Sequence, residues 1–336
     1  MDHVELKSKG GRSERTMLCR VASELFWMAR HIERAENTAR LLDVTYRTSL
    51  MPFQVTEPGL AWAAPWAMPL MTTGLATEYY ERNPTLSGEA VLKFLIFDAT
   101  NPSSVYSCLR AARESARNVR VAIASEMYED LNSAWLEMRR FNFEAVQRMG
   151  VSDFLEWVKM QSHRFRGVTF GTMLRDEAYD FIQLGTYIER ADNTARILDV
   201  KYHLLLPSVA DVGGAVDYYQ WSALLQSVSS LDAYRKMYSD VITPRRVAEL
   251  LIHRADMPRS LHCCMNHIHD TVDNLGNGNA REVQRLAGQL HAELHYGRTD
   301  EVFEVGMHEY LMDFLERVSK VGDEINRAFL APAYAS

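Results

Sequence analysis

The sequence is poor in the residues that interrupt regular structure. Its 336 residues include only 17 glycines and 10 prolines, the residue types that most often end helices or form turns. Apolar residues recur with helical periodicity, and stretches that alternate apolar and polar residues, as half-buried strands do, are nearly absent. We therefore predict an all-α protein with about nine to twelve helices.

The chain also lacks signals of disulfide bonding, secretion and membrane insertion. Its four cysteines form no CxxC pair, and two of them are neighbours, an arrangement that rarely bridges. No run approaches the roughly 18–20 apolar residues of a membrane span. The polar residues 1–16 lack the apolar centre of a secretory signal. We expect a reduced, cytoplasmic protein in which residues 1–16 form a flexible N-terminal extension.

Motifs for nucleotide binding and for nucleophilic catalysis are missing too. The sequence contains no GxxxxGK(S/T) loop, no G-x-G-x-x-G after a strand and no G-x-S-x-G elbow. A formal net charge of −7 argues against nucleic acid as the main partner. We predict no bound cofactor, and we expect a partner protein to bind any ATP that the pathway uses.

What the sequence does contain is an internal repeat. Residues 31–46 read HIERAENTARLLDVTY and residues 187–202 read YIERADNTARILDVKY, with twelve of sixteen positions identical at an offset of 156. The same offset relates Cys108 to Cys264. An offset held over so long a stretch indicates an ancient internal duplication.

The repeat predicts a helical bundle built from two duplicated halves. We expect a single domain over residues 17–330, with halves at about 17–170 and 171–330 and a C-terminal tail at 331–336. If each half's first helix packs against the other, the two halves are related by a pseudo-two-fold axis.

Prolines and their neighbours predict several helix boundaries. A long helix is expected at about Leu18–Leu50 and another at about Arg175–Leu206, because a proline soon follows each segment. Asn101-Pro102 and Met257-Pro258 are predicted to start the helices that follow, with asparagine capping the first of them and proline in the first turn.

The repeated segments carry polar residues that helix packing alone does not require. On a helical wheel they form one stripe per copy, flanked by apolar residues, at spacings i, i+4 and i+7. The two stripes consist of Glu33, Asn37 and Arg40 and of Glu189, Asn193 and Arg196. Such a stripe is expected to be buried, with Asn37 bridging Glu33 and Arg40, because an unpaired buried polar group costs about 1–3 kcal/mol.

Two interpretations of the stripes stay open. In the first, they are a structural brace, since removing one partner from a buried ion pair costs about 3–5 kcal/mol. In the second, they line a polar pocket where arginine forks bind carboxylates or phosphates. Arg34 and Arg190, at the shoulders of the stripes, are expected to reach the opposite copy. Glu33-x-x-Glu36 and Glu189-x-x-Asp192 can hold Mg²⁺, but the adjacent arginines favour internal ion pairs.

Histidines and cysteines near the C-terminus have spacings that metal sites use. Cys263, His267 and Asp270 share one helical face, but the first copy has serine and alanine where the second has Cys263 and His267. His291 and His295 lie in HAELH, whereas the HExxH motif of zinc proteases places glutamate directly after the first histidine. We predict ordinary helix-face histidines and no metal site.

Two strings carry a resemblance to a known family. They are MLCRVASELFWMARHIERAENTARLLD, from Met17 to Asp43, and GTMLRDEAYDFIQLGTYIERADNTARILD, from Gly171 to Asp199. They resemble the two signatures of the bacterial alpha-E domain family, and the likeness spans nearly the whole chain after residue 16. The family is named for its helices and for a Glu-Arg motif, here Glu33-Arg34 and Glu189-Arg190.

The resemblance implies a partnership rather than a named reaction. Members of the family have no known biochemical function and resemble partners of circularly permuted ATP-grasp ligases, beside which they are encoded or to which they are fused. This implies a bacterial pathway that makes or modifies a peptide-like amide. The chain departs from the family's pattern at Thr186, where arginine is usual, and over residues 176–179.

These observations favour a non-catalytic accessory protein of an ATP-grasp-type peptide or amide ligase system. It would bind the ligase, a peptide-like or carboxylate ligand, or both, at the junction of the two copies. The residues predicted to line or brace that junction are Glu33, Arg34, Asn37, Arg40, Glu189, Arg190, Asn193 and Arg196, joined by Thr172 and Arg175. Two alternatives stay open: an enzyme that forms or transfers amide bonds with its paired carboxylates, and a structural interaction module.

Overall fold

The computed structural model describes residues 17–50, 65–203, 214–239, 241–276 and 280–331. All regular elements within these ranges are helical: sixteen α-helices and two short π-helical segments. The prediction of an all-α protein is confirmed. More helices are present than predicted because turns and glycines divide several segments into short helices, as Gly74 does at a left-handed φ of 70°. The predicted N-terminal extension and nearly all of the predicted tail lie outside the described ranges.

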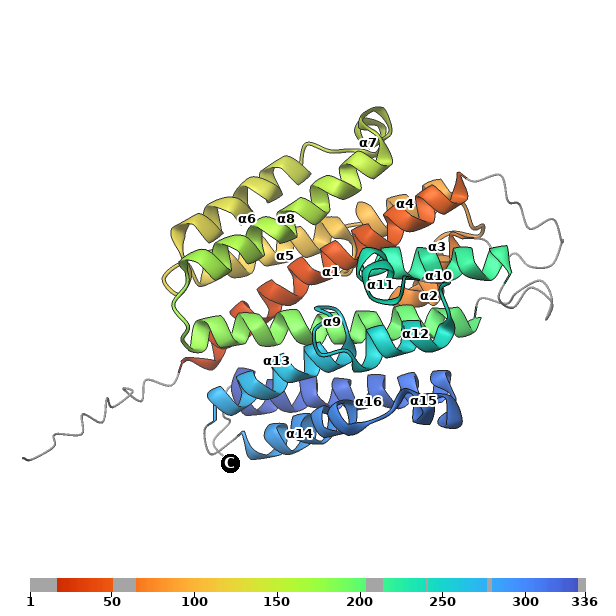
Figure 1. Cartoon of the computed structure of the whole chain (residues 1–336). Coiled ribbons are helices and arrows are strands. Elements are labelled where there is room, and N and C mark those ends of the chain that lie inside the picture. The colour runs from red at the N-terminus through yellow and green to blue at the C-terminus, as the bar shows by residue number, and fades with distance from the viewer. Residues whose placement is uncertain (1–16, 51–64, 204–213, 240, 277–279, 332–336) are drawn as a thin grey trace, which may run out of the picture.

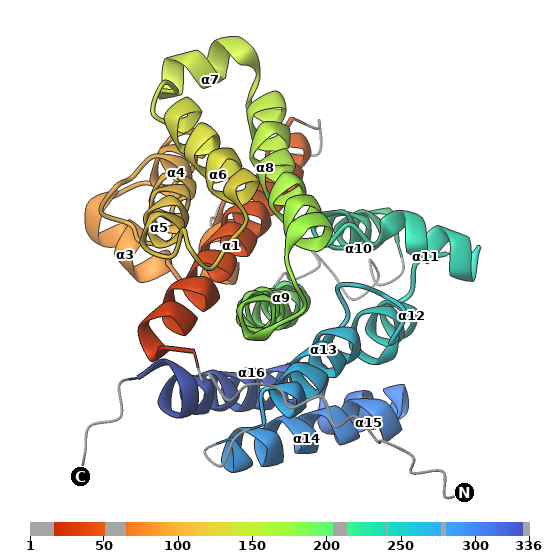
Figure 2. The same cartoon turned by 90° about the vertical axis from the view of Figure 1, so that its left-hand side faces the viewer.

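Two long helices form the centre of the molecule. They are α1 (Cys19–Ser49) and α9 (Glu177–His203), and they pack against each other. In Figure 1 they cross the middle of the bundle, and in Figure 2 α9 is seen end-on with other helices around it. Both lie where the sequence predicted long helices. The predicted end of the second one, at Leu206, lies outside the described residues.

Each long helix is covered by its own set of helices. α1 packs on α5 (Val105–Asn118) and α8 (Val151–Thr172), and α6 (Ser125–Met138) packs on both of these, with α7 (Phe143–Met149) leading into α8. These helices form the upper part of Figure 1. The arrangement covers one side of α1 and leaves the other side for α9.

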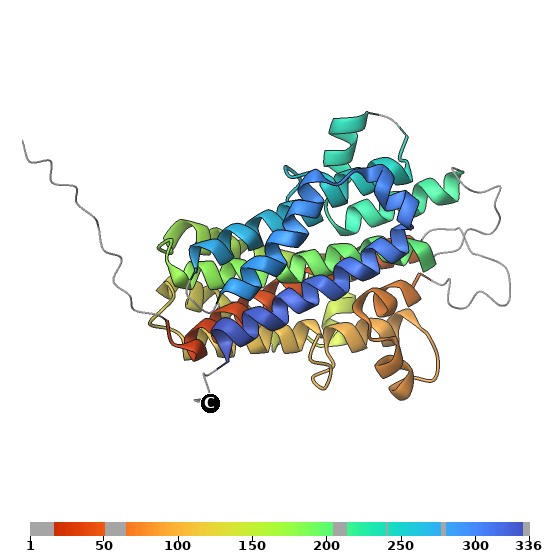
Figure 3. The same cartoon turned by 90° about the horizontal axis from the view of Figure 1, so that it is seen from below.

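The second long helix is covered in the same manner. α9 packs on α13 (Leu261–Asn274) and α16 (Met307–Ile325), and α14 (Arg281–Tyr296) packs on both, with α15 (Thr299–Val305) leading into α16. Figure 3 shows α14 and α16 side by side on the lower face of the bundle.

Shorter helices complete the bundle. They are α2 (Ala67–Thr73), α3 (Ala76–Arg82), α4 (Gly88–Ile96), α10 (Ala215–Ser227), α11 (Leu231–Tyr238) and α12 (Pro244–Ala248), with π-helical segments at Glu249–His253 and Asn326–Leu330. Thr243 caps α12, which has proline in its first turn. No helix of the described residues is long and apolar enough to cross a membrane.

Two predicted helix starts are wrong. α5 and α13 do not begin at Asn101-Pro102 and Met257-Pro258 but at the residues after Ser104 and Ser260. The Ser104 hydroxyl accepts from the backbone N–H of Ser107 at 3.1 Å, and Ser260 accepts from Cys263 at 2.9 Å. A serine hydroxyl at this position satisfies an amide that the helix leaves unpaired, so the serines, not the prolines, set both starts.

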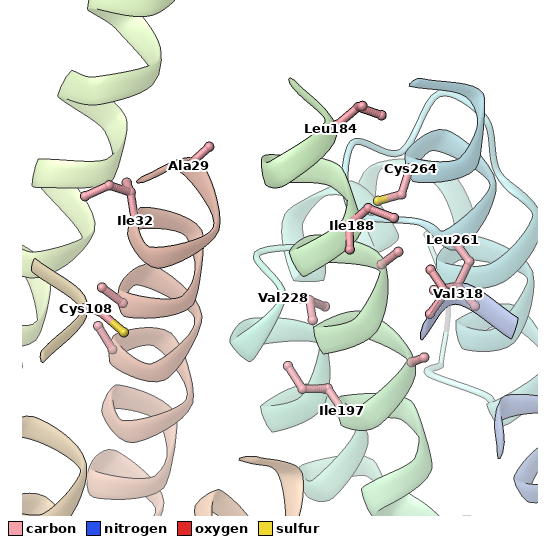
Figure 4. Packing of buried hydrophobic residues seen from close by; sticks show 14 of the residues in the cluster. Ala29, Ile32, Cys108, Leu184, Ile188, Ile197, Val228, Leu261, Cys264 and Val318 are labelled. Atoms are coloured by element: carbon pink, nitrogen blue, oxygen red, sulfur yellow. The ribbon is translucent and has the colours of Figure 1, made fainter. Parts of the chain in front are cut away.

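The two long helices approach each other through small residues. A Cβ atom added at Gly185 of α9 would overlap the carbonyl oxygen of Phe26 in α1 and would lie 3.2 Å from the Cβ of Ala29. One hydrophobic cluster includes residues of α1, of α9 and of the helices that cover them. In Figure 4, Cys108 lies beside α1, and Cys264 lies beside Ile188 of α9. Because the two backbones approach so closely, side chains of α1 can contact side chains of α9.

Candidate functional site

The Glu-Arg motifs of the two long helices pair with each other. The Nε of Arg34 in α1 donates to Oε1 of Glu189 in α9 at 2.6 Å, and its Nη2 donates to Oε2 at 3.0 Å. In return, Arg190 donates through Nε and Nη2 to the two oxygens of Glu33, each at 2.9 Å. Both pairs are bidentate, the arrangement that gives an arginine–carboxylate pair its strength and fixed geometry. Each of the two arginines therefore reaches a glutamate of the other long helix.

The two reciprocal pairs have different surroundings. Glu189 also accepts from Nε of Arg30 at 2.8 Å. Glu33, only 1% exposed, also accepts from Arg259 at 3.1 Å and from Arg166 at 3.0 Å. The Glu33 side of the junction therefore holds more arginines than the Glu189 side.

A second buried carboxylate extends the Glu33 side. Glu36 is 0% exposed and accepts from Arg259 Nη2 at 2.7 Å, from Arg40 Nε at 2.8 Å and from the Ser162 hydroxyl at 2.6 Å. Arg166 also donates to it. We call Glu33 and Glu36, with Arg40, Arg166, Arg190 and Arg259, the arginine cluster. It places four guanidinium groups around two carboxylates, which leaves two positive charges in excess.

The arginine cluster opens to solvent at one edge. There the side chains of Arg40, His163 and Arg166 are 13%, 42% and 31% exposed, and we call these three residues the arginine edge. His163 Nε2 lies 3.2 Å from Arg40 Nη2. Burial and the neighbouring arginines lower the pKa of His163, against the opposing effect of Glu36, so the imidazole is neutral near pH 7. Two partly exposed guanidinium groups at the rim of an electropositive cluster form a suitable site for an anion.

The carboxylates of the cluster are poor candidates for proton transfer. Burial alone would raise the pKa of Glu33, but Arg190 and Arg259 outweigh it and hold the pKa below its usual range. Arg259 and Arg166 do the same for Glu36, whose pKa lies well below the usual range. A carboxylate that binds protons so weakly is an inefficient general base near neutral pH. Its oxygens are also occupied by arginines, which leaves Mg²⁺ little access to the Glu33-x-x-Glu36 pair.

The Glu189 pair predicts how stability changes in acid. Burial alone would raise the pKa of Glu189, but Arg34 and Arg30 lower it from 4.5 to about 2. Because the folded-state pKa is the lower one, the stabilisation is complete above about pH 4.5 and is lost as the pH falls toward about 2. We expect the difference in unfolding free energy between wild type and Glu189→Gln to shrink by about 3 kcal/mol over this window.

Urea denaturation of both proteins at stepped pH measures that difference. Taking the difference cancels the other carboxylates, which titrate in both proteins over the same range. A difference that stays constant from pH 6 to pH 2 (roughly the window set by these pKa values) would contradict the assignment of Glu189 to a buried ion pair.

The other predicted stripe residues take no part in the two reciprocal Glu-Arg pairs. Asn37 does not bridge Glu33 and Arg40, because Arg40 pairs with Glu36 one turn away, and the Asn37 Oδ1 instead accepts from Arg259 at 2.9 Å. Asn193 is half-buried. Arg196 pairs with Asp192 through Nε at 2.8 Å and lines a surface hollow beside α16.

Thr172 and Arg175 are engaged at the corner between α8 and α9. The Thr172 hydroxyl donates to the carbonyl of Val168 at 2.8 Å, one turn back in its own helix. The Arg175 guanidinium lies over the rings of Phe170 and Tyr179, at 4.6 and 4.0 Å from their centroids. Their described contacts are therefore local, and neither interaction joins them to the glutamates of the junction.

Sequence reasoning missed two arginines of the cluster. Arg166 lies in α8, and Arg259 lies in the turn just before the Ser260 cap of α13. At an offset of 156 they match Gly322 and Ser103, so the repeat gave no signal for either. The partner of such an arginine belongs to another helix, and it can be identified only when the packing of the helices is known.

Comparison of the sequence with known proteins identifies relatives and a family. Uncharacterized proteins of Mycobacterium bovis (Mb2597) and Mycobacterium tuberculosis (MT2643) are each 23% identical over 303 residues, which cover 85% of this chain and 33% of each relative. The chain thus spans about a third of the length of the curated relatives it matches. No solved structure matches it significantly. Residues 17–330 match the Alpha-E family, described as a predicted alpha-helical domain with a conserved ER motif, and the chain therefore belongs to that family.

Proposed function

We propose that this chain is a non-catalytic accessory module that binds an anionic, peptide-like ligand for an ATP-grasp-type peptide or amide ligase. One observation carries the proposal. The junction between the long helices is internally paired except for an excess of positive charge, and that excess reaches solvent at the arginine edge, Arg40, His163 and Arg166. A carboxylate or phosphate of the ligand would supply the missing negative charge.

The module is built, in this proposal, from two duplicated halves, at about 17–170 and 171–330, related by a pseudo-two-fold axis. The positions of the helices support this. α5 begins at Val105 and α13 at Leu261, while α8 begins at Val151 and α16 at Met307, each pair 156 residues apart. Both α8 and α16 follow a glycine with φ above 100°, and the packing partners of α1 and α9 correspond in the same order.

Within this frame the reciprocal pairs are the brace and the arginine edge is the binding surface. Both carboxylate oxygens of Glu33 and of Glu189 accept hydrogen bonds from arginines. In this proposal these pairs hold the two halves in register. Arg166 differs from Arg190 and Arg259 because about a third of its side chain is exposed. The brace and pocket interpretations of the stripe are thus both used, at different residues.

A ligase partner is supported by the family resemblance and by the size of the relatives. The matched segment is 33% of the mycobacterial proteins, so a region like this chain occurs there beside other regions of the same protein. An accessory module that presents a ligand to a separate ligase unit accords with that arrangement. The low pKa of the cluster carboxylates disfavours the alternative of an enzyme with acid–base catalysis by this pair.

We expect Arg166→Gln to weaken binding of an acidic ligand by at least about tenfold, because a lost charged fork corresponds to about 1.4 kcal/mol or more. Calorimetric titration with a Glu-Glu dipeptide and with inorganic phosphate measures this. Arg164→Gln is the matched control, since Arg164 lies on the same helix and is exposed. Thermal denaturation of each variant checks that it is folded, and Arg166→Lys retains the charge without the fork.

Equal binding by the Arg166 and Arg164 variants, or no binding of either probe by wild type, would overturn the assignment of the arginine edge. Co-elution with a purified ATP-grasp ligase of the same organism tests the partnership separately. Turnover of amide substrates by the purified chain alone would instead support the alternative of an independent enzyme.

A further inference from the structure

Three histidines from two helices converge away from the long-helix junction. His262 comes from the first turn of α13, and His291 and His295 lie one turn apart on α14. The nitrogens that they offer all lie within 4.8 Å of one another. This is the one group of three such side chains with metal-ligand spacing in the described ranges of the chain. The sequence predicts His291 and His295 to be ordinary helix-face histidines, and helical periodicity alone does not place His262 beside them.

His262 is oriented as a ligand, with its second nitrogen free. Its Nδ1 lies 2.7 Å from the carbonyl oxygen of His253, and because a carbonyl only accepts, Nδ1 carries the proton. In the neutral ring Nε2 then presents a lone pair. That Nε2 is buried and has no hydrogen-bond partner, in a residue that is 5% exposed. Metal-binding histidines share this arrangement, in which one nitrogen donates to a backbone carbonyl and the other binds the ion.

The other two histidines close the site from its solvent side. His291 is half-buried and His295 is exposed, with ring centroids 6.1 and 5.3 Å from that of His262. The three side chains thus run from buried to exposed across the group.

We propose that His262, His291 and His295 bind a divalent transition metal, Zn²⁺, with a fourth coordination position open to water. Three imidazoles and a water form a tetrahedral set that zinc accepts. Zn–N bonds of about 2.0–2.1 Å place tetrahedral ligands about 3.3 Å apart, so the ion draws the two outer rings toward His262. Their partial exposure gives them room to turn.

The α5–α6 interface, which corresponds to the α13–α14 interface at an offset of 156, packs without histidine. At an offset of 156, Tyr106 of α5 stands for His262 and Trp135 of α6 stands for His291. Those two rings pack edge to face with centroids 4.9 Å apart. An aromatic pair therefore fills the same interface between two helices, whereas the α13–α14 interface leaves a buried nitrogen unpaired, which is costly unless a ligand completes it.

Titration of the untagged protein with Co²⁺ tests the proposal, because tetrahedral Co²⁺ has a visible absorption band that reports its ligands. We expect one Co²⁺ per chain, displaced by Zn²⁺, and a rise in melting temperature with Zn²⁺. The double variant His291→Gln/His295→Gln is expected to bind more than about 100-fold more weakly, beyond the loss typical of an outer-shell change.

His267→Gln is the matched control. His267 lies on α13 as His262 does, but its ring stacks on Tyr187 at 4.0 Å instead of joining the group. Its variant should bind Co²⁺ like wild type and thereby confirm the assignment. Absence of a tetrahedral band in wild type, equal affinity of the double variant, or loss of binding in His267→Gln would each overturn the site.

Discussion

Replacing Glu33 by glutamine is expected to lower the free energy of unfolding by about 3–5 kcal/mol. The substitution keeps the shape of the side chain and removes its charge. It leaves Arg190 and Arg259, each only 6% exposed, without the carboxylate that both contact. Arg259 keeps its contact with Glu36, but Arg190 becomes a buried cation without its counter-ion, which is strongly unfavourable, so the loss exceeds that of an ordinary polar substitution. Urea denaturation followed by circular dichroism measures it.

Glu137→Gln provides the control for this experiment. Glu137 lies near the end of α6 and is exposed, so its variant should match wild type to within about 0.5 kcal/mol. If Glu33→Gln were as stable as Glu137→Gln, the buried pairs would not hold the helices together. This comparison also bears on function. If Glu33 were not needed for stability, its role at the junction would have to be sought in ligand binding instead.

Replacing Gly185 by alanine is expected to be nearly as damaging as losing an ion pair. The new Cβ would overlap the Phe26 carbonyl oxygen, which belongs to backbone and cannot turn aside. α1 and α9 must therefore separate, and separation lengthens both reciprocal pairs. Overpacking of a tight contact costs about 1–3 kcal/mol, occasionally more, and we expect the upper end here. Thermal and urea denaturation measure the loss.

Gly167→Ala is the matched control for the helix contact. Gly167 lies in the C-terminal third of α8 with nothing within 4 Å of an added Cβ, so alanine there should stabilise the protein by about 0.5–1 kcal/mol through its better helix propensity. Opposite signs for the two glycines would confirm the close approach of α1 and α9. Equal stabilisation by both substitutions would show that the long helices do not meet at Gly185.

The sequence was most informative about the long helices. Apolar periodicity and a proline after each segment located α1 and α9, and the repeated Glu-Arg motif showed that Arg34 and Arg190 had to find partners. The starts of other helices were harder to predict, because a single glycine or serine decides where a helix begins. Ser104 and Ser260 set the starts of α5 and α13 by capping, although the prolines before them were the more conspicuous signal.

The site was only partly predictable, for a different reason. Arg166 and Arg259 have no counterparts in the repeat, and their partners come from α1, far away in the sequence. The same holds for His262, whose position beside His291 depends on how α13 packs on α14. Periodicity shows which face of a helix is buried, but not which helix covers it.

The most direct test of the account is a double-mutant cycle on Glu33 and Arg190. Glu33→Gln, Arg190→Met and the double variant are compared with wild type by urea denaturation. We predict a coupling energy of about 2–3 kcal/mol between these residues of different helices. The reference cycle pairs Glu33→Gln with Arg34→Met, since Arg34 adjoins Glu33 in the sequence but pairs with Glu189, and it should give less than about 0.5 kcal/mol. Additive effects in the Glu33–Arg190 cycle would contradict the claim that the two Glu-Arg motifs lock the long helices together.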